Sequence, residues 1–465
     1  MMHRWNENSL FKYVSPTPKL LALGVGAILV SFAIGAIEYS FNAVLNALNT
    51  GSEIRFSMIY FLSFIVSIGF FILAFLERRN RSVEKDIYYL VRYRLCASSM
   101  GNPLHLRPGE VEPDVSVIRI NNSEFRIRIS CRSAKFENLA SLESVISDCL
   151  RKEHSNFAVV KKSEDISGCY VDYYIKDVAK EYRKQSKYKS LADVPSYVDT
   201  KIHIRDDVVI DYSKVLNSSA LIVGSTRSGK TTGIISTFLL PVLKAGSDCY
   251  GSKVVIIDPK SAELGRCSYV LSPALDGCVE HILNEIKTFN QTRIERQQII
   301  NQKGLELGKA ARWFEIGMKP CILFIDEWVS LQDLFPKKAP KENPDYCLAN
   351  FQGLIRQIAT QGASAGCFLI VSTAQASVGV GGLDSVVNHS CGIRVLFKPT
   401  KEEAKFLWDS GQINELREGY FGPGDAWFSV DDGIQNDVSF VKFPKLGQQF
   451  DEYQALDELL QAYYL

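Results

Sequence analysis

Residues 224–231 of this 465-residue chain read Gly-Ser-Thr-Arg-Ser-Gly-Lys-Thr. The apolar residues 220–223 precede this stretch as a buried strand would, and residues 232–240 are compatible with a helix. Gly224 and Gly229 let the backbone curl so that successive N–H groups point inward, and the following helix adds the positive end of its dipole. Strand, glycine-rich loop and helix in this order are typical of a phosphate-binding P-loop.

The side chains of this loop predict its ligand. Lys230 can reach the β- and γ-phosphates of a nucleoside triphosphate, and the Thr231 hydroxyl is placed to ligate Mg²⁺. The residues that we expect to surround the phosphates are Gly224, Ser225, Thr226, Arg227, Ser228, Gly229, Lys230, Thr231 and Thr232.

A second apolar run, residues 321–325, ends in two adjacent carboxylates, Asp326 and Glu327. We expect this strand to lie beside the P-loop strand, so that Asp326 holds Mg²⁺ directly or through water. Glu327, one residue on, is suited to polarise the attacking water. The alternative is a solvated strand end. Together with the P-loop, the pair predicts that the chain binds and hydrolyses a nucleoside triphosphate.

Composition limits the other classes of site. The net charge is +1, so a nucleic-acid site must be local rather than spread over the chain. The 11 cysteines are scattered, with no C-x-x-C pair, and several lie in apolar runs as free buried thiols do in a reducing compartment. This pattern disfavours metal binding through thiolates.

Two segments near the N-terminus, residues 20–37 and 56–76, carry no charged side chain. Roughly 20 apolar residues span a bilayer as a helix, so we predict a transmembrane hairpin with helices at about residues 20–39 and 56–76. The basic residues that flank the pair are Arg4, Lys12 and Lys19 on one side and Arg78, Arg79, Arg81 and Lys85 on the other. By the positive-inside rule, the tail 1–19 and the bulk of the chain lie in the cytoplasm, and the protein is a multi-pass protein of the cytoplasmic (inner) membrane. A cleaved signal peptide and a buried core hairpin are the alternatives.

Beyond the membrane segments the pattern changes twice. Residues 77–199 predict a linker and a small α+β assembly domain, with two strand hairpins and a helix. Residues 200–445 alternate short apolar strands with helical segments, which predicts a mostly parallel sheet covered by helices on both faces. Lys230, Asp258, Asp326 and Gln375 all fall at the carboxyl ends of such strands, so the sheet would bring them together. Residues 446–465 predict a C-terminal helix, which covers either a neighbouring subunit or the motor domain of its own chain.

The motif order supports a resemblance. Residues 257–264 (Ile-Asp-Pro-Lys-Ser-Ala-Glu-Leu), 322–328, 354–359 and 368–375 follow the P-loop in the order of FtsK/SpoIIIE-type DNA translocases. With two transmembrane helices and one motor domain, the chain resembles most the membrane-anchored coupling-protein ATPases of conjugative and integrative elements. These are similar to the coupling proteins of type IV secretion systems and belong to the HerA/FtsK superfamily.

The resemblance implies a RecA-like P-loop motor that assembles as a homo-hexamer, with ATP and Mg²⁺ at subunit interfaces and DNA in a central channel. It implies that Lys230, Asp326 and Glu327 are catalytic and that Gln375 senses the γ-phosphate. The implied function is an ATP-driven DNA translocase that moves DNA to a conjugative transfer channel. The implied partners are DNA, a relaxase or DNA-processing complex, transfer-channel proteins and the membrane.

The sequence departs from this family at several points. The sensor strand ends Thr-Ala-Gln-Ala at residues 373–376, without the arginine that the chromosome translocases carry there. A basic residue of the preceding helix is replaced by Ala363, so the trans-acting arginine is unassigned, with Arg356 and Arg394 as candidates. Residues 335–341 and 378–382 are candidate DNA-contacting loops or ordinary surface loops. Two alternative functions stay open: an FtsK-like ATPase that powers type VII-like protein secretion, and a scaffold that binds ATP only to assemble.

Overall fold

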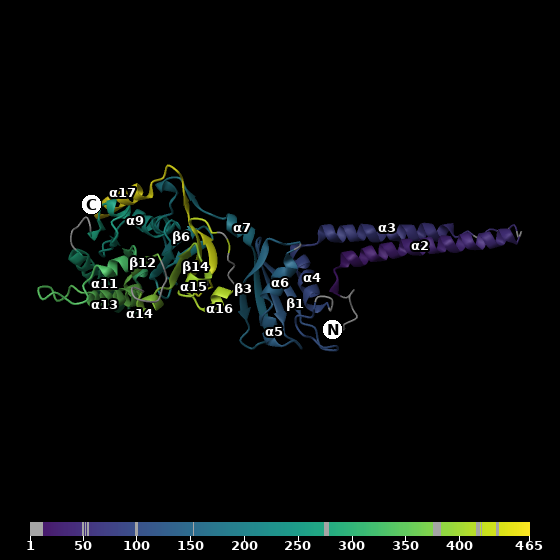
Figure 1. The fold of residues 1–465 in the computed structure, drawn as a ribbon, viewed down its shortest axis with the longest axis horizontal. Helices are drawn as coiled ribbons and strands as arrows, with labels where there is room; N and C mark the ends of the chain where they lie inside the picture. The colour runs from purple at the N-terminus through teal and green to yellow at the C-terminus, as the bar shows by residue number, and fades with distance from the viewer. Residues whose placement is uncertain are drawn as a thin grey trace. The chain divides into compact units, whose positions relative to one another are not determined.

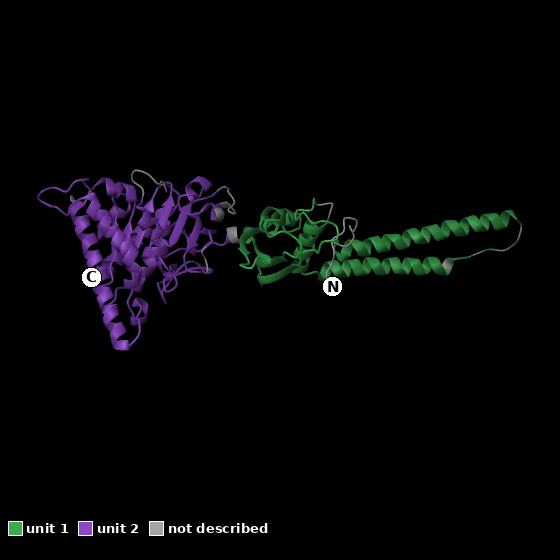
Figure 2. Cartoon of the chain, turned by 90° about the horizontal axis from the view of Figure 1, so that it is seen from below, with its two compact units in different colours: residues 1–180 green, residues 181–465 purple. Residues whose placement is uncertain are grey.

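The protein is described by a computed structural model. The structure describes residues 13–48, 51, 53, 55–97, 101–151, 153–273, 279–374, 383–414, 419, 421–433 and 437–465. The chain forms two compact units, residues 1–180 and 181–465, coloured separately in Figure 2. Within the second unit, β5 (Lys187–Tyr188) pairs with β16 (Lys445–Leu446).

The first unit opens with two long apolar helices, α2 (Pro16–Ala47) and α3 (Ser57–Asn80), which pair as a hairpin (Figure 1). Both are long and apolar enough to cross a membrane. The Ser67 hydroxyl donates to the Gly24 carbonyl across the pair at 2.9 Å. Most of their large apolar side chains are exposed, which suits a membrane anchor.

Helix α2 is longer than the expected residues 20–39 at both ends. Pro16 lies in its first turn, where its fixed φ is compatible with a helix and its missing N–H costs nothing. Residues 38–47 contain no glycine or proline, so nothing in the sequence ends the helix where the apolar run stops. Residues 40–47, expected in the loop between the two spans, are thus helical.

The rest of the first unit is a small α+β domain. Its sheet has the order β1-β2-β4-β3, and every neighbouring pair is antiparallel. Strand β2 buries alternate residues, Phe125, Ile127 and Ile129, against the helices. Both hairpins expected from the sequence are present. Its elements are α4 (Val83–Cys96), β1 (Val115–Asn121), β2 (Glu124–Ser130), α5 (Phe136–Ala140), α6 (Glu143–Leu150), β3 (Phe157–Glu164) and β4 (Tyr170–Asp177), followed by the connecting α7 (Val178–Arg183).

The second unit is built on an eight-stranded sheet of order β10-β9-β11-β12-β8-β13-β14-β15. The first six strands are mutually parallel, and β14 and β15 are antiparallel to their neighbours. The strands of this sheet are β8 (Ala220–Gly224), β9 (Val254–Ile257), β10 (Val270–Leu271), β11 (Cys321–Ile325), β12 (Cys367–Thr373), β13 (Ile393–Phe397), β14 (Asp425–Val430) and β15 (Ser439–Lys442). The predicted α/β class with a mostly parallel sheet matches this arrangement.

One expectation about the sheet is wrong. The P-loop strand β8 and the carboxylate-bearing strand β11 are not neighbours, because β12 pairs with both and lies between them. The crossover after β11 returns the chain to the gap beside β8, so chain order and sheet order differ. The carboxyl ends of β8, β12 and β11 still lie along one edge of the sheet.

Helices cover both faces of the sheet (Figure 1). Strand β11 shows the division: Ile322 and Phe324 join the cluster of the P-loop helix and α17, whereas Leu323 and Ile325 join that of α11, α12 and α13. The C-terminal helix therefore packs on the sheet unit of its own chain. The helices are α8 (Lys230–Ile234), η3 (Ile235–Leu239) and α9 (Leu240–Ala245), which run on as the P-loop helix, with η4 (Leu264–Arg266), α11 (Val279–Leu307), η5 (Trp313–Ile316), α12 (Trp328–Asp333), α13 (Leu348–Ala365), α14 (Ser385–His389), α15 (Lys401–Ala404), α16 (Ser410–Asn414) and α17 (Glu452–Tyr464). Short elements before the sheet are η2 (Leu191–Asp193), β6 (Lys201–Arg205) and β7 (Val208–Asp211).

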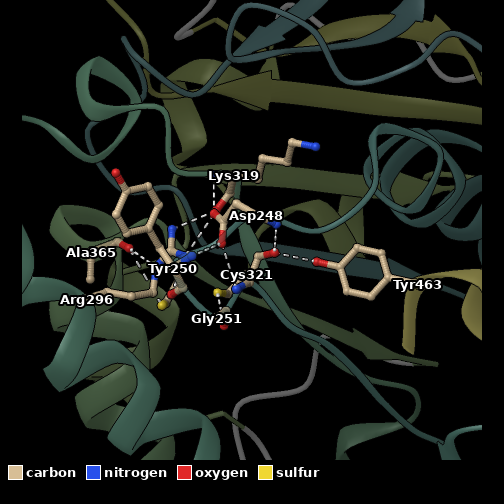
Figure 3. Close-up of polar contacts among 10 residues, drawn as sticks. Asp248, Tyr250, Gly251, Arg296, Lys319, Cys321, Ala365 and Tyr463 are labelled. Atoms are coloured by element: carbon tan, nitrogen blue, oxygen red, sulfur yellow. Dashed lines mark hydrogen bonds and ion pairs between the residues drawn. The ribbon is translucent and has the colours of Figure 1, made fainter. Parts of the chain in front are cut away.

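A buried ion pair ties helix α11 to the amino end of β11 (Figure 3). Arg296 is 1 % exposed and donates to the Lys319 carbonyl at 2.7 Å and to Asp248 at 3.3 Å. Burial raises the pKa of Asp248, but N–H groups of Lys319, Tyr250 and Ser252 and the Arg296 charge more than offset this and hold it below its ordinary value. Because both charges are compensated, the cluster holds the amino end of the sheet together.

Candidate nucleotide-binding site

The P-loop joins β8 to α8 through a backbone path that requires glycine. Gly229 has φ of +87°, and a Cβ there would lie 2.7 Å from the backbone N of Gly424. A Cβ at Gly224 would lie 2.8 Å from the Ser228 hydroxyl and from Phe397. Both positions therefore exclude a side chain, and the loop curls tightly at the carboxyl end of its strand.

The curled loop fits a bound phosphate. The Ser228 hydroxyl is buried and has no hydrogen-bond partner among the described residues. The first N–H groups of the helix that begins at Lys230 have no acceptor within that helix. Burial lowers the pKa of Lys230, while Asp326 and Glu327 counteract this shift. An anion beside the Lys230 ammonium would favour its charged form.

The acid pair faces the P-loop lysine. Glu327 Oε2 lies 3.8 Å from Lys230 Nζ, so the expected meeting of these residues is present. Asp326 Oδ1 accepts a hydrogen bond from the Ser372 hydroxyl at 2.7 Å, and burial raises the pKa of Asp326. Glu327 is the N-cap residue just before helix α12; its φ is +59°, an uncommon conformation for this residue type, and it is 8 % exposed. Such local strain is often found at functional sites.

A second lysine also holds Glu327. Lys260 Nζ lies 3.1 Å from Glu327 Oε2, and the N–H of Ala374 donates to Glu327 Oε1 at 3.2 Å. Lys260 belongs to the Asp-Pro-Lys segment after β9, in which the sequence predicts a place at the site for Asp258 but not for Lys260. The carboxylate of Asp258 anchors this segment by accepting N–H bonds from Lys260 (3.1 Å) and Gly265 (3.0 Å).

The structure brings some of the expected site residues together but not all of them. Lys230, Asp326 and Glu327 come together, and Asp258 lies next to them but is engaged by its own loop. The Thr232 hydroxyl, expected at the phosphates, donates instead to Glu452 of α17 at 3.0 Å. Gln375 and the candidate loop 378–382 lie outside the described residues.

The two candidate arginines are engaged within the chain. Arg356 pairs with Asp384 through its Nε at 2.7 Å, and Arg394 donates to the carbonyl of Cys391 at 3.0 Å. Burial lowers the pKa of Arg394. Neither contact favours a role in a neighbouring subunit.

Three residues around the site had no predicted role: Lys260, Ser372 and Gly424. The backbone N of Gly424 donates to the Ser228 carbonyl at 2.8 Å and so closes the loop from one side. The Gly-Pro-Gly sequence at 422–424 is a turn signal that could have marked it. Ser372 could not have been predicted in the same way, because no sequence pattern distinguishes a serine whose hydroxyl contacts a site residue from any other serine in a buried strand.

The arrangement can bind a triphosphate and a divalent cation. The P-loop N–H groups and Lys230 suit phosphate oxygens, and Thr231 and Asp326 carry oxygen atoms of the kind that Mg²⁺ prefers. A nucleoside triphosphate supplies a phosphoanhydride bond whose hydrolysis releases free energy. Lys260 and Ala374 hold the carboxylate of Glu327, a group that could accept a proton from a water molecule.

Part of the sequence matches a known protein. The chain is 29 % identical over 157 residues to the FtsK domain-containing protein YdcQ of Bacillus subtilis, a match that covers 32 % of this chain and 28 % of that protein. The chain is therefore similar to FtsK domain-containing proteins, as its motifs predict. The match spans little more than a quarter of the length of YdcQ. No family model matches the sequence.

Solved structures align at lower similarity. The monomer form of the pCW3 conjugation coupling protein TcpA with ATPγS is 14 % identical, with a TM-score of 0.46, covering 75 % of this chain and 93 % of that one. EssC (ATPases 2 and 3) from Geobacillus thermodenitrificans is 15 % identical, with a TM-score of 0.40, covering 60 % of this chain and 52 % of that one.

Proposed function

We propose that the chain is a membrane-anchored, ATP-driven DNA translocase that couples DNA to a conjugative transfer channel. The observation that carries the proposal is the meeting of Lys230 with the Asp326–Glu327 pair, 3.8 Å from Lys230 Nζ to Glu327 Oε2, at the carboxyl edge of a parallel sheet. The similarity to an FtsK domain-containing protein supports a motor of this class, and the two apolar helices support an anchor.

The proposed roles follow from the contacts. Lys230 and Thr231 bind the phosphates, and Thr231 also binds Mg²⁺. Asp326 is the second metal ligand, and the Ser372 hydroxyl orients its carboxylate. Glu327 accepts a proton from the attacking water. Lys260 positions Glu327 through their 3.1 Å contact. The sheet order, with β12 between β8 and β11, supports a RecA-like motor.

The assembly belongs to the same proposal. By the resemblance, a homo-hexamer would place ATP between subunits and DNA in a central channel, with a relaxase and channel proteins as partners. Basic residues flank both apolar helices, which supports a two-pass anchor in the cytoplasmic membrane with the motor in the cytoplasm.

The test is ATP hydrolysis by the full chain in detergent, with and without DNA. We expect DNA to stimulate turnover, and Lys230→Ala to abolish both turnover and DNA transfer in cells. Lys201→Ala, which removes an exposed lysine outside the P-loop, is the matched control and should leave both unchanged. Stimulation by a secreted protein but not by DNA would favour a protein-secretion motor. Absence of turnover would favour an assembly scaffold.

A further inference from the structure

A cavity of about 860 Å³ lies at the amino ends of the parallel strands. Its lining includes Ser218 just before β8, Trp313 before β11, and Ser364 at the end of α13, which precedes β12. The P-loop and the acid pair lie at the carboxyl ends of these strands. A five-residue strand is about 17 Å long, so the cavity and the candidate nucleotide site are on opposite edges of the sheet.

The charges of this cavity all have one sign. Three cationic residues, Lys214, Lys309 and Arg312, line it and are exposed, and none of its lining residues, all within the described part of the chain, is acidic. Lys214 Nζ lies 3.5 Å from Asp211, a residue outside the lining. Apolar side chains also line the cavity, the buried Trp313 among them. Cations beside apolar side chains fit a ligand with carboxylates and apolar groups.

Two leucines of the lining face solvent. Leu216 is 71 % exposed and Leu305 is 84 % exposed. A small molecule within the cavity would leave these side chains uncovered, and the phosphates of a nucleic acid would pair with the cations but not with leucines. A peptide segment with apolar anchors satisfies both features, because interfaces bury apolar side chains at their centre and keep charges at the rim.

We propose that this cavity is a docking site for a partner protein, which inserts a segment that carries carboxylates and bulky apolar side chains. The proposal goes beyond the ATPase function and does not depend on DNA translocation. Since the cavity lies on the edge of the sheet away from Lys230, a docked segment leaves the candidate nucleotide site free. Variants at the cavity should therefore lose the partner and keep basal ATP hydrolysis.

The experiment uses the full chain in the cells from which it derives, with the photo-reactive amino acid benzoylphenylalanine in place of Leu305. Cross-linked material is digested, and the attached segment is identified by mass spectrometry. We expect a protein segment with a net negative charge and at least two large apolar residues. A cross-link to DNA, to a second copy of this chain or to a neutral or basic segment overturns the proposal, and so does the absence of any cross-link.

Charge reversal completes the test. The cavity variant carries Lys214→Glu, Lys309→Glu and Arg312→Glu. The control variant makes the same change in net charge at exposed lysines elsewhere on the motor unit, Lys201→Glu, Lys405→Glu and Lys445→Glu. A synthetic peptide of the cross-linked segment should bind the cavity variant at least about tenfold more weakly than the wild type. It should bind the control with unchanged affinity, and basal ATP hydrolysis should be unchanged in both. Equal affinity for the cavity variant and the wild type would overturn the proposal.

Discussion

Replacing Glu327 with glutamine tests whether the acid pair performs chemistry. Glutamine has the same shape, keeps an oxygen that can accept from the N–H of Ala374, now 3.2 Å from Oε1, and meets the same backbone strain at φ of +59°. What it loses is the negative charge that faces Lys260 at 3.1 Å and Lys230 at 3.8 Å. The change therefore separates the charge of this residue from its packing.

Two magnitudes decide the outcome. The Lys260 side chain is 53 % exposed, so solvent screens its pair with Glu327, and loss of this pair costs at most about 1 kcal/mol of folding free energy. The buried Lys230 also loses Glu327 as a partner, but it keeps the opposite charge of Asp326 beside it. Loss of a general base lowers turnover by about 10²–10⁴-fold, or roughly 3–5 kcal/mol of transition-state stabilisation. Because the loss of folding free energy is small and the loss of transition-state stabilisation is large, Glu327→Gln should fold and bind ATP. It should hydrolyse ATP at least about 100-fold more slowly than the wild type.

The assay compares ATP hydrolysis, binding of a fluorescent ATP analogue and thermal unfolding in the full chain. Glu263→Gln is the matched control, because Glu263 is an exposed carboxylate in the same segment as Lys260. It should behave as the wild type in all three measurements. Turnover of Glu327→Gln within about threefold of the wild type, with intact ATP binding, would refute a general-base role and favour the assembly scaffold.

Further substitutions test the physical arguments above. Burial raises the pKa of Asp326 above its ordinary value of 3.8, so the ionised carboxylate destabilises the folded state at any pH above 3.8. Asp326→Asn should therefore raise the melting temperature at neutral pH without nucleotide. The gain in melting temperature should shrink as the pH falls towards 3.8. A gain that is the same at every pH between 4 and 8 would contradict this. Gly229→Ala should cost about 1–3 kcal/mol in chemical denaturation and abolish ATP binding, because its φ is +87° and its Cβ has no room. Gly353→Ala, with open space in helix α13, should instead gain about 0.5–1 kcal/mol. Arg296→Met should cost about 3–5 kcal/mol because it leaves Asp248 buried without its cation, and adding Asp248→Asn should restore part of the loss.

The parts of the site that the sequence predicts are those at strand ends. Lys230, Asp326 and Glu327 each follow a recognisable apolar run, and the carboxyl ends of parallel strands share an edge, so their meeting needs no knowledge of strand order. The order of the strands in the sheet cannot be predicted from the sequence, because no local pattern indicates that β12, which ends at Thr373, lies between β8 and β11. The error about the neighbour of the P-loop strand therefore left the prediction of the acid pair intact.

Other contacts depend on turns that the sequence does not specify. Lys260 reaches Glu327 only because Asp258 folds the segment after β9 back on itself. Thr232 belongs to the P-loop motif, yet its hydroxyl faces Glu452, more than 200 residues away in sequence, because α17 packs on the P-loop helix. Such pairings are set by tertiary packing rather than by local pattern.

The charges of the site argue for a triphosphate and a divalent cation together. Two lysines, Lys230 and Lys260, face the carboxylates of Asp326 and Glu327 and offset their charge, while the adjacent carboxylate of Asp258 accepts N–H bonds from its own loop. Burial disfavours the charged forms of both Lys230 and Asp326, which makes an uncompensated charge costly there. If a polyanion binds Lys230, Lys260 is the remaining lysine that offsets the charge of Asp326 and Glu327. A divalent cation would neutralise the excess negative charge that results. The same electrostatics that stabilise the apo cluster thus disfavour either ligand without the other.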